Sequence, residues 1–406
     1  MPRIFYGNFD FEHELAAPSY NRSKQLERLN AELSIHLLAF ADDGDRLFYD
    51  DDSLAEFLTD AATAGFPNAQ TLALVNQPIP DAELVPWGWS RPAISIGTSR
   101  GWSGNGPAHG VVAIVNSRTF SFEAEQRLDF SIPGAVRIDS IEMLEVAINQ
   151  AGNIWNRSVE EFDWLLKAEF GMSGRERVTG TGSQLEDSQA GWIRRRLNSG
   201  GGLYFEPRVE PLCELSSQWL IPRPDSGGGL SMEPDLIGTT QLLVDRSGQY
   251  LGSILVDRSS VVIPSIAVSE FSLSRENLDH LLQGARSVAK AAQQAGYHGP
   301  LGIDSMVYRG VDGQPAARAI QDVNARLTMG RIALEWFRRF AKTDRPAWLL
   351  VPEVWLDERG VAAALDNPAA RLTSPRAVAG HPVRRVGVLI DDRDDWRKLL
   401  TTDLRP

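Results

Sequence analysis

The chain has one cysteine, few lysines and no long apolar segment. Cys213 is the only cysteine in 406 residues, which excludes an intrachain disulfide and a metal site built from cysteines. No stretch approaches the roughly eighteen consecutive apolar residues of a membrane span. The N-terminal residues also lack the continuous apolar region of a signal peptide. We therefore expect a cytoplasmic protein with no membrane partner.

Positive charge is also scarce. The sequence has 41 lysines and arginines against 53 acidic residues, a formal net charge of -12. A general nucleic-acid-binding protein presents a basic surface to the phosphates, and this balance argues against one. With 43% hydrophobic and 23% charged residues, the composition is that of an ordinary globular protein, and the length is enough for two or three domains.

The two commonest glycine-rich nucleotide signatures, GxxxxGK[ST] and GxGxxG, do not occur. Residues 97–101, GTSRG, do match the G-x-S-x-G motif in which Ser99 would be the nucleophile of a serine hydrolase. That motif needs a helix directly after the serine, whereas WSGNGP follows here and is typical of a loop. We predict a glycine-rich connecting loop and keep the serine hydrolase as a remote alternative.

Residues 1–115 alternate short apolar runs with amphipathic segments. Three runs have the composition of strands: residues 3–9, 69–75 and 110–115. Residues 24–38 carry leucines at helical spacing, and residues 53–64 form a second predicted helix with Ser53 as its N-cap. This alternation predicts a small α/β layer with partly parallel strands.

A hairpin with a polar end is predicted between residues 302 and 323. Asp312-Gly313 is a strong turn signal. Side chains two apart on a strand share a face, so Asp322 and Asn324 present two oxygen donors side by side, with Arg326 next if the strand continues. Oxygen donors of this kind suit Mg²⁺, which fills its remaining positions with water and phosphates.

The hairpin register decides whether Asp304 joins this cluster. A two-residue loop at Asp312-Gly313 pairs Asp304 with Gln321, whereas a five-residue loop over residues 311–315 pairs it with Asp322. The second register places two carboxylates and one amide on one face. The sequence leaves both registers open, together with a simple solvated hairpin that carries scattered acids.

Basic residues and glycines upstream favour a phosphate site. Lys167 lies in the apolar run 162–168, where a charge is costly unless it meets a counter-charge. The loop Gly171-Met172-Ser173-Gly174 follows, and its backbone N–H groups can approach an oxyanion. Arg118 is placed between a predicted strand and a helix, where anions bind readily, although a surface arginine is the simpler interpretation of that residue alone.

A purine-binding hinge is predicted further along. Residues 202–209 form a predicted strand that runs into Glu206-Pro207-Arg208-Val209, and Glu214 follows. An extended hinge offers backbone C=O and N–H groups to a purine edge, and a nearby carboxylate accepts hydrogen bonds from ribose hydroxyls.

In this order, the features resemble the ATP-grasp superfamily over residues 116–345. The resemblance implies an α/β protein with the ATP-grasp fold, in which two α+β subdomains clasp ATP. A small Rossmann-like α/β domain precedes them in the chain. The implied division is residues 1–115 for the preceding domain, 116–345 for the ATP-grasp domain with a lid at 155–210 and a metal-site subdomain at 211–345, and 346–406 for a C-terminal extension.

The resemblance also assigns roles to residues. ATP would be bound by Lys167, Gly171, Ser173, Gly174, Glu206, Pro207, Val209 and Glu214. Mg²⁺ would be bound by Asp304, Asp322 and Asn324, and the transferring phosphate would be stabilised by Arg326, Lys167 and Arg118. The superfamily usually has glutamate where Asp322 stands, so the number of metal ions is left open.

The implied reaction is an ATP-dependent ligation. A carboxylate becomes an acyl phosphate, which an amine or thiol attacks, and ADP and phosphate are released. The partners would be a small-molecule carboxylate and a small-molecule amine, and the sequence determines neither their identity nor whether the chain forms a homo-oligomer. A non-catalytic or regulatory nucleotide-binding protein of the same fold is the main alternative.

Overall fold

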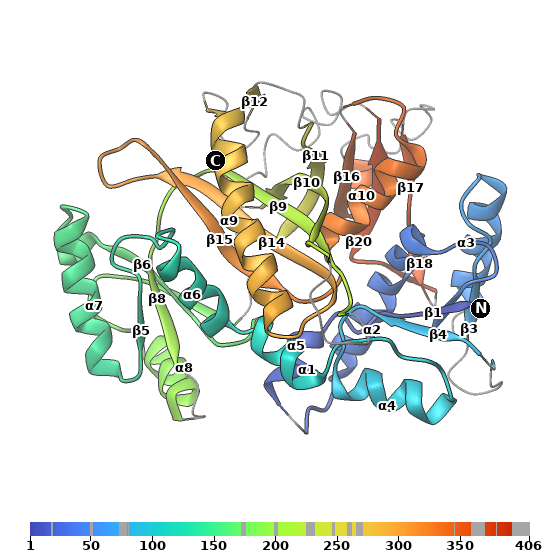
Figure 1. Cartoon of the computed structure of the whole chain (residues 1–406), viewed down its shortest axis with the longest axis horizontal. Helices are drawn as coiled ribbons and strands as arrows, with labels where there is room; N and C mark the ends of the chain where they lie inside the picture. Colours follow the sequence, from blue (N-terminus) through green and yellow to red (C-terminus); the bar gives the residue numbers. More distant parts are fainter. Residues whose placement is uncertain are drawn as a thin grey trace.

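The computed structural model contains three main sheets, seen together in Figure 1: a parallel sheet of four strands, an antiparallel sheet of four strands and an antiparallel sheet of eight strands. The structure describes residues 1–17, 19–48, 52–72, 79, 81–171, 176–198, 202–224, 232–245, 248–257, 262–264, 271–344, 346–358, 370–378 and 380–391. Within these ranges, every helix is too short or too polar to cross a membrane.

The first sheet lies at the N-terminus. In spatial order its strands are β3 (Gln70–Leu72), β2 (Arg46–Phe48), β1 (Arg3–Tyr6) and β4 (Glu83–Pro86), and every pair is parallel. Its helical segments are α1 (Phe11–Ala16), α2 (Lys24–Ser34), the 3₁₀ helix η1 (Ile35–Phe40), α3 (Asp52–Thr63) and α4 (Arg91–Arg100). The predicted α/β layer is confirmed, and the predicted strand 69–75 is described only as far as β3.

Three local predictions in this region are wrong. Residues 110–115 form helix α5 (His109–Val115), not a strand, with Val112 and Val115 buried three residues apart and Ile114 exposed between them. The predicted loop at residues 97–101 is the last turn of α4 and its glycine cap. The second predicted helix, α3, begins at Asp52, so Ser53 lies inside the helix and is not its N-cap.

The end of α4 removes the structural basis for the hydrolase alternative. Ser99 lies in the last turn, where its hydroxyl donates a hydrogen bond to the carbonyl of Ile96 at 2.9 Å. Gly101 then ends the helix with a φ of 68°, a left-handed conformation that favours glycine. A nucleophile elbow needs its serine before a helix, and Ser99 comes at the end of one.

The second sheet, at the left in Figure 1, has the strand order β5-β8-β6-β7 and is covered by two helices. Its elements are β5 (Val136–Ile138), α7 (Ile141–Ile154), the 3₁₀ helix η2 (Val159–Glu161), β6 (Asp163–Lys167), β7 (Arg177–Thr181), α8 (Asp187–Asn198) and β8 (Leu203–Pro207). Trp164 and Phe205 lie in the core between the strands and the helices. Helix α6 (Arg118–Arg127), which precedes this sheet, packs against the large sheet at β15.

The large sheet is entirely antiparallel. In spatial order its strands are β15 (Pro315–Asn324), β14 (Gly299–Arg309), β9 (Pro211–Ile221), β10 (Asp235–Val244), β11 (Tyr250–Leu255), β16 (Ala347–Pro352), β20 (Arg385–Ile390) and β17 (Ala370–Leu372). Thus β16, β20 and β17 extend the same sheet as β14 and β15. Smaller elements are β12 (Val262–Pro264), β13 (Ser272–Ser274), α11 (Trp355–Glu358), β18 (Ala377–Val378) and β19 (His381–Pro382).

Two long helices cover this sheet. Helix α9 (Arg275–Gln294) packs against β15, β9 and β14, and α10 (Met329–Phe340) packs against β11, β10 and β16. The sequence predicts a helix at residues 276–295 and another at 329–340, and both are confirmed. Helix α10 forms because Thr328 caps its first turn by accepting from the backbone N–H of Arg331, and because Ile332, Trp336 and Phe337 place a continuous apolar face on the sheet.

The β14–β15 hairpin has the register that joins the two acids, because Asp304 pairs with Asp322. The route differs from the prediction. Arg309 pairs with Pro315, which leaves a loop over residues 310–314 and would set Asp304 opposite Ile320 if the ladder were regular. A register shift between Asp304 and Met306 moves the pairing by two residues, so a bulge brings the carboxylates together.

Candidate active site

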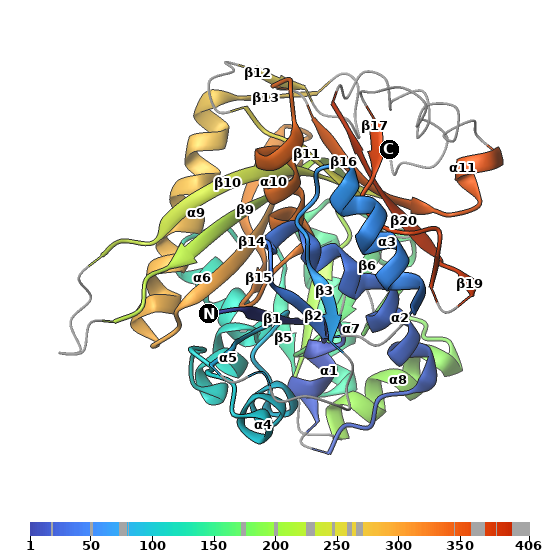
Figure 2. The same cartoon turned by 90° about the vertical axis from the view of Figure 1, so that its right-hand side faces the viewer.

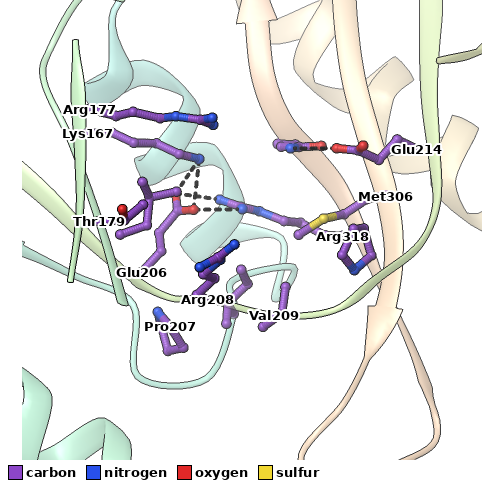
Figure 3. Close-up of a pocket in the computed structure, with 14 residues that line it drawn as sticks. Lys167, Arg177, Thr179, Glu206, Pro207, Arg208, Val209, Glu214, Met306 and Arg318 are labelled. Carbon is purple, nitrogen blue, oxygen red and sulfur yellow. Dashed lines mark hydrogen bonds and ion pairs between the residues drawn. The ribbon is translucent and has the colours of Figure 1, made fainter. Parts of the chain in front are cut away.

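Two neighbouring cavities lie between the second sheet and the large sheet. The first, shown in Figure 3, has a volume of about 360 Å³, and the second has a volume of about 370 Å³. Both are lined by Lys167, Arg177, Glu214 and Gln321. These four side chains therefore mark the place where the cavities meet.

Lys167 stands at the end of β6 and meets a carboxylate on the adjacent strand β8. Its ammonium nitrogen lies 2.8 Å from Oε2 and 3.0 Å from Oε1 of Glu206. Burial lowers the pKa of Lys167 despite the attraction of Glu206. The buried lysine thus has a counter-charge within the protein, Glu206, whereas the sequence pointed to a phosphate as its partner.

A buried arginine that the sequence analysis missed completes this ion cluster. Arg318, on β15, is 2% exposed and makes two hydrogen bonds to each of two carboxylates, those of Glu125 on α6 and Glu206 on β8, at 2.7 to 3.0 Å. Burial alone would raise the pKa of Glu206, but Arg318 and Lys167 outweigh it and lower that pKa. Figure 3 shows Glu206 between the two cations.

The first cavity is lined by the predicted hinge. Pro207 ends β8, and Arg208 and Val209 follow it; apolar side chains from other elements also line the cavity: Ile132, Leu165 and Met306. Glu214, on β9, accepts a hydrogen bond from the amide of Gln321 at 3.3 Å. The cavity is mostly polar, and its apolar side chains give it a part against which a purine ring could pack.

Two carboxylates of the hairpin lie at the second cavity. The hydroxyl of Ser216 donates to Asp304 Oδ1 at 2.6 Å, and the amide of Asn324 donates to Asp304 Oδ2 at 3.1 Å. Burial, and then the charge of Asp322, raise the pKa of Asp304 to about 6. A cation bound between the two acids would relieve both effects, so this donor set fits Mg²⁺.

Few acids are available for such a metal. The described residues contain no group of three or more histidine, cysteine or acidic side chains placed to hold an ion. Two carboxylates and the amide of Asn324 are the predicted donors, so most of the coordination sphere would come from water and phosphate oxygens. That pattern is usual for Mg²⁺.

Arg118 already contacts one of these acids. It is the first residue of α6, after the cap Ser117, and it follows helix α5 where a strand was predicted. Its guanidinium lies 3.2 Å from Asp322 Oδ2 and donates to the carbonyl of Gln321 at 3.1 Å. Within the described residues its Nε is buried without a hydrogen-bond partner, so a donor is available to a ligand.

Arg326 lies beyond the end of β15 and is held by the N-terminal part of the chain. Its Nε donates to Glu12 at 2.5 Å, its Nη2 donates to Asn324 Oδ1 at 2.9 Å, and the guanidinium carbon lies 5.3 Å from the centre of the Trp87 ring. Glu12 was not singled out from the sequence, and the loop at residues 85–89, which contains Trp87, was predicted only as a place for substrate specificity. Their contacts join distant segments, so no local pattern could reveal them.

Of the predicted glycine loop, Gly171 lines the second cavity. Ser173 and Gly174 lie outside the described residues. The cavities thus bring together eleven of the thirteen predicted site residues: Arg118, Lys167, Gly171, Glu206, Pro207, Val209, Glu214, Asp304, Asp322, Asn324 and Arg326. They are also lined by Arg318, which was not predicted.

Comparison with known proteins identifies the fold. Biotin carboxylase from Campylobacter jejuni, solved as a beta-gamma-ATP complex, is similar with a TM-score of 0.52 and 14% identity, covering 89% of this chain and 86% of that one. The ADP complex of PurK, an N5-carboxyaminoimidazole ribonucleotide synthetase, gives a TM-score of 0.52 and 10% identity, with 98% and 94% coverage. No protein-family model and no curated protein matches the chain.

A third similar structure is the biotin carboxylase domain of 2-oxoglutarate carboxylase from Hydrogenobacter thermophilus, solved with MgADP, ADP and bicarbonate. Its TM-score is 0.52 at 14% identity, with coverage of 99% of this chain and 90% of that one. The chain therefore shares the fold of these three structures. That fold is the ATP-grasp fold, and the predicted fold class is confirmed.

Proposed function

We propose that the protein is an ATP-dependent ligase that activates a small-molecule carboxylate as an acyl phosphate for attack by an amine. The observation that carries the proposal is the meeting of the two cavities at Lys167. One cavity has the hinge residues and some apolar side chains that could pack on adenine, and the other has the two carboxylates and Arg326. A nucleotide lying across the junction would extend its phosphates past Lys167 toward Asp304 and Asp322.

The residues suit each part of ATP. The backbone of Pro207 and Val209 would contact adenine, and Glu214, which lines both cavities, would accept from the ribose hydroxyls. Lys167 and the backbone at Gly171 would contact the phosphates. Asp304, Asp322 and Asn324 would hold Mg²⁺, which neutralises charge on the phosphates when bound. Nucleotide complexes of the similar biotin carboxylase and PurK structures support this placement.

The reaction needs positioning and charge neutralisation, because no side chain acts as a nucleophile. A substrate carboxylate oxygen attacks the γ-phosphorus of ATP, the bond from that phosphorus to the bridging oxygen breaks, and ADP leaves. An amine then attacks the acyl carbon, loses a proton and displaces phosphate. Arg118, Lys167 and Arg326 would stabilise the charge that is transferred in the first step.

Hydroxylamine gives a direct test of the acyl phosphate. The purified protein with Mg·ATP is incubated with single carboxylates, including bicarbonate, acetate and apolar acids, and both ADP and the hydroxamate formed with hydroxylamine are measured. We expect one or more organic acids to produce both in equal amounts. Asp304→Asn, which keeps the shape of the side chain, should abolish both products. ADP formation that no carboxylate stimulates would contradict the ligase proposal.

A nucleotide-binding protein without turnover is the second candidate. The ion pair of Arg118 with Asp322 favours it, because a guanidinium already neutralises one predicted metal ligand. In that case the protein would bind ATP, and neither ADP nor hydroxamate would form with any acid. The two candidates therefore give different results in the same assay.

A further inference from the structure

The second cavity has an apolar wall that the proposed nucleotide does not use. Leu29 and Leu33 lie one turn apart on α2, so their side chains share a face, and both line the cavity while only partly buried. Phe9 and Trp87 add two aromatic rings whose centres are 4.3 Å apart. Such a surface does not stabilise a bound phosphate. It would stabilise an apolar organic group, because packing there removes apolar surface from water.

A cation outside every predicted site faces the same cavity. Arg385, on β20, donates from Nη1 to the carbonyls of Tyr250 at 2.7 Å and Leu350 at 3.2 Å, and from Nη2 to Gln249 Oε1 at 3.3 Å. These neutral acceptors fix the guanidinium without neutralising it. Among the described residues, the carboxylate within ion-pair distance is that of Asp245, at 3.7 Å. Burial lowers the pKa of Arg385, and a bound anion would offset that cost.

The apolar wall and Arg385 belong to one side of the cavity. Helix α2 contacts the segment that leads into β20: the backbone N–H of Arg384 donates to Glu32 at 3.1 Å, and Arg28 donates to the carbonyl of Pro382, in β19, at 2.9 Å. Figure 2 shows α2 beside β20.

The phosphate side of the cavity is also near Arg385. A Cβ built on Gly248, next to Gln249, would lie 2.8 Å from a guanidinium nitrogen of Arg177, which lines both cavities. Gln249 in turn accepts from Arg385. An anion on Arg385 would therefore lie close to the junction where the proposed phosphates enter the second cavity.

We propose that this side of the cavity is the carboxylate-substrate subsite and that the substrate is a carboxylic acid with an apolar body. Arg385 pairs with the substrate carboxylate, and Leu29 and Leu33 pack against its hydrocarbon part. The inference rests on the proposed ligase function and deepens it, because bicarbonate or acetate would leave the apolar wall uncovered.

Calorimetric titration of acids into the protein saturated with Mg·AMP-PNP tests this subsite. The probes are acetate, 4-methylpentanoate, 3-phenylpropanoate and the neutral 4-methylpentanamide. We expect the two apolar acids to bind about tenfold more tightly than acetate or better, as for burial of several methylene groups. Arg385→Gln should weaken binding of both apolar acids about tenfold and leave the affinities for the amide and for AMP-PNP unchanged. Arg384→Gln, the exposed neighbour, is the matched control and should change none of them.

Leu33→Asn provides a second variant that does not depend on the arginine. It should reduce the preference for the apolar acids over acetate while AMP-PNP still binds. The inference is overturned if AMP-PNP binds but acetate binds as tightly as the apolar acids, or if Arg385→Gln weakens the acid and the amide equally. Absence of AMP-PNP binding to the wild type would instead overturn the proposed function.

Discussion

At the scale of single residues, the site depends on charges that are buried together. Arg318 lies between Glu125 and Glu206, and Lys167 contacts Glu206 from the other side. The two cations Arg318 and Lys167 thus balance the two carboxylates Glu125 and Glu206 in a buried cluster. Such a cluster contributes little net stability compared with apolar residues, but removal of one member leaves a buried charge without a partner.

Arg318→Met should therefore destabilise the protein strongly. Lys167 still compensates Glu206 in this variant, so Glu125 is the acid left alone, and we expect a loss of about 3 to 5 kcal/mol in the free energy of unfolding. Denaturant-induced unfolding measures it. The control is Arg309→Met on the same hairpin, which breaks an exposed pair with Glu210 and should cost no more than about 1 kcal/mol. Equal losses in the two variants would contradict the importance of burial.

The carboxyl group of Asp304 makes metal binding depend on pH. Its pKa of about 6 lies above the ordinary aspartate value, so the metal-free folded protein loses stability as the pH rises from about 4 through 6 and the buried group ionises. Mg²⁺ binds the ionised form. We expect the rise in melting temperature caused by Mg·AMP-PNP, relative to metal-free AMP-PNP, to be small at pH 5 and to reach its full size above pH 7.

Asp304→Asn is the control for this pH dependence, because it removes the titrating group and keeps its size. The Mg²⁺-dependent rise in melting temperature should be small in this variant at every pH. A wild-type rise that is the same at pH 5 and pH 7.5 would show that Asp304 is not the group that metal binding requires.

At the scale of elements, long periodic segments were predictable and short apolar ones were not. Helix α10 was predicted at its observed bounds, Met329–Phe340, because its apolar residues repeat with the helical period over three turns. The run HGVVAIV is too short to show a helical period. Its β-branched residues favour a strand, but in the folded protein it forms helix α5. The pairing of Asp304 with Asp322 was one of two predicted registers, but the bulge that produces it has no signal in the sequence.

The ion cluster was only half predictable. Lys167 was noticed as a lone charge in an apolar strand, and Arg318 in the run Ala-Arg-Ala-Ile could have been found by the same reasoning. Glu125 and Glu12 could not, because their roles depend on contacts between elements far apart in the chain. Arg385 was missed because its strand, β20, had been assigned to an extension of unknown role.

The connection between β8 and β9 is the element that we expect to bind adenine through its backbone. Val209→Pro removes one N–H group, and Val209→Ala keeps it while shortening the side chain. Proline should weaken the binding of ATP by about tenfold, because a hydrogen bond to the backbone is lost and the backbone geometry changes. Alanine should have a much smaller effect. Fluorescence titration with a labelled ATP analogue measures both. Similar affinities in the two variants would contradict recognition by the backbone of Val209.

At the scale of the whole molecule, the two antiparallel sheets and the N-terminal part of the chain contribute to the candidate site. Strands β6 and β8 provide Lys167 and Glu206, strand β15 provides Arg318, and Glu12 and Trp87 of the N-terminal part hold Arg326. A nucleotide bound at the junction would therefore contact several parts of the chain at once. We expect AMP-PNP with Mg²⁺ to stabilise all of them together.

The most direct test of the proposed site is calorimetric titration of AMP-PNP, with and without Mg²⁺, into the wild type and Lys167→Met. Lys290→Met on α9, which breaks an exposed pair with Glu233, is the matched control. We predict Mg²⁺-dependent binding to the wild type and the control, and about tenfold weaker binding or worse to Lys167→Met, because a charge-assisted contact to phosphate is lost. Equal affinity of Lys167→Met and the wild type, or no binding to either, would contradict a nucleotide site at the junction of the two cavities.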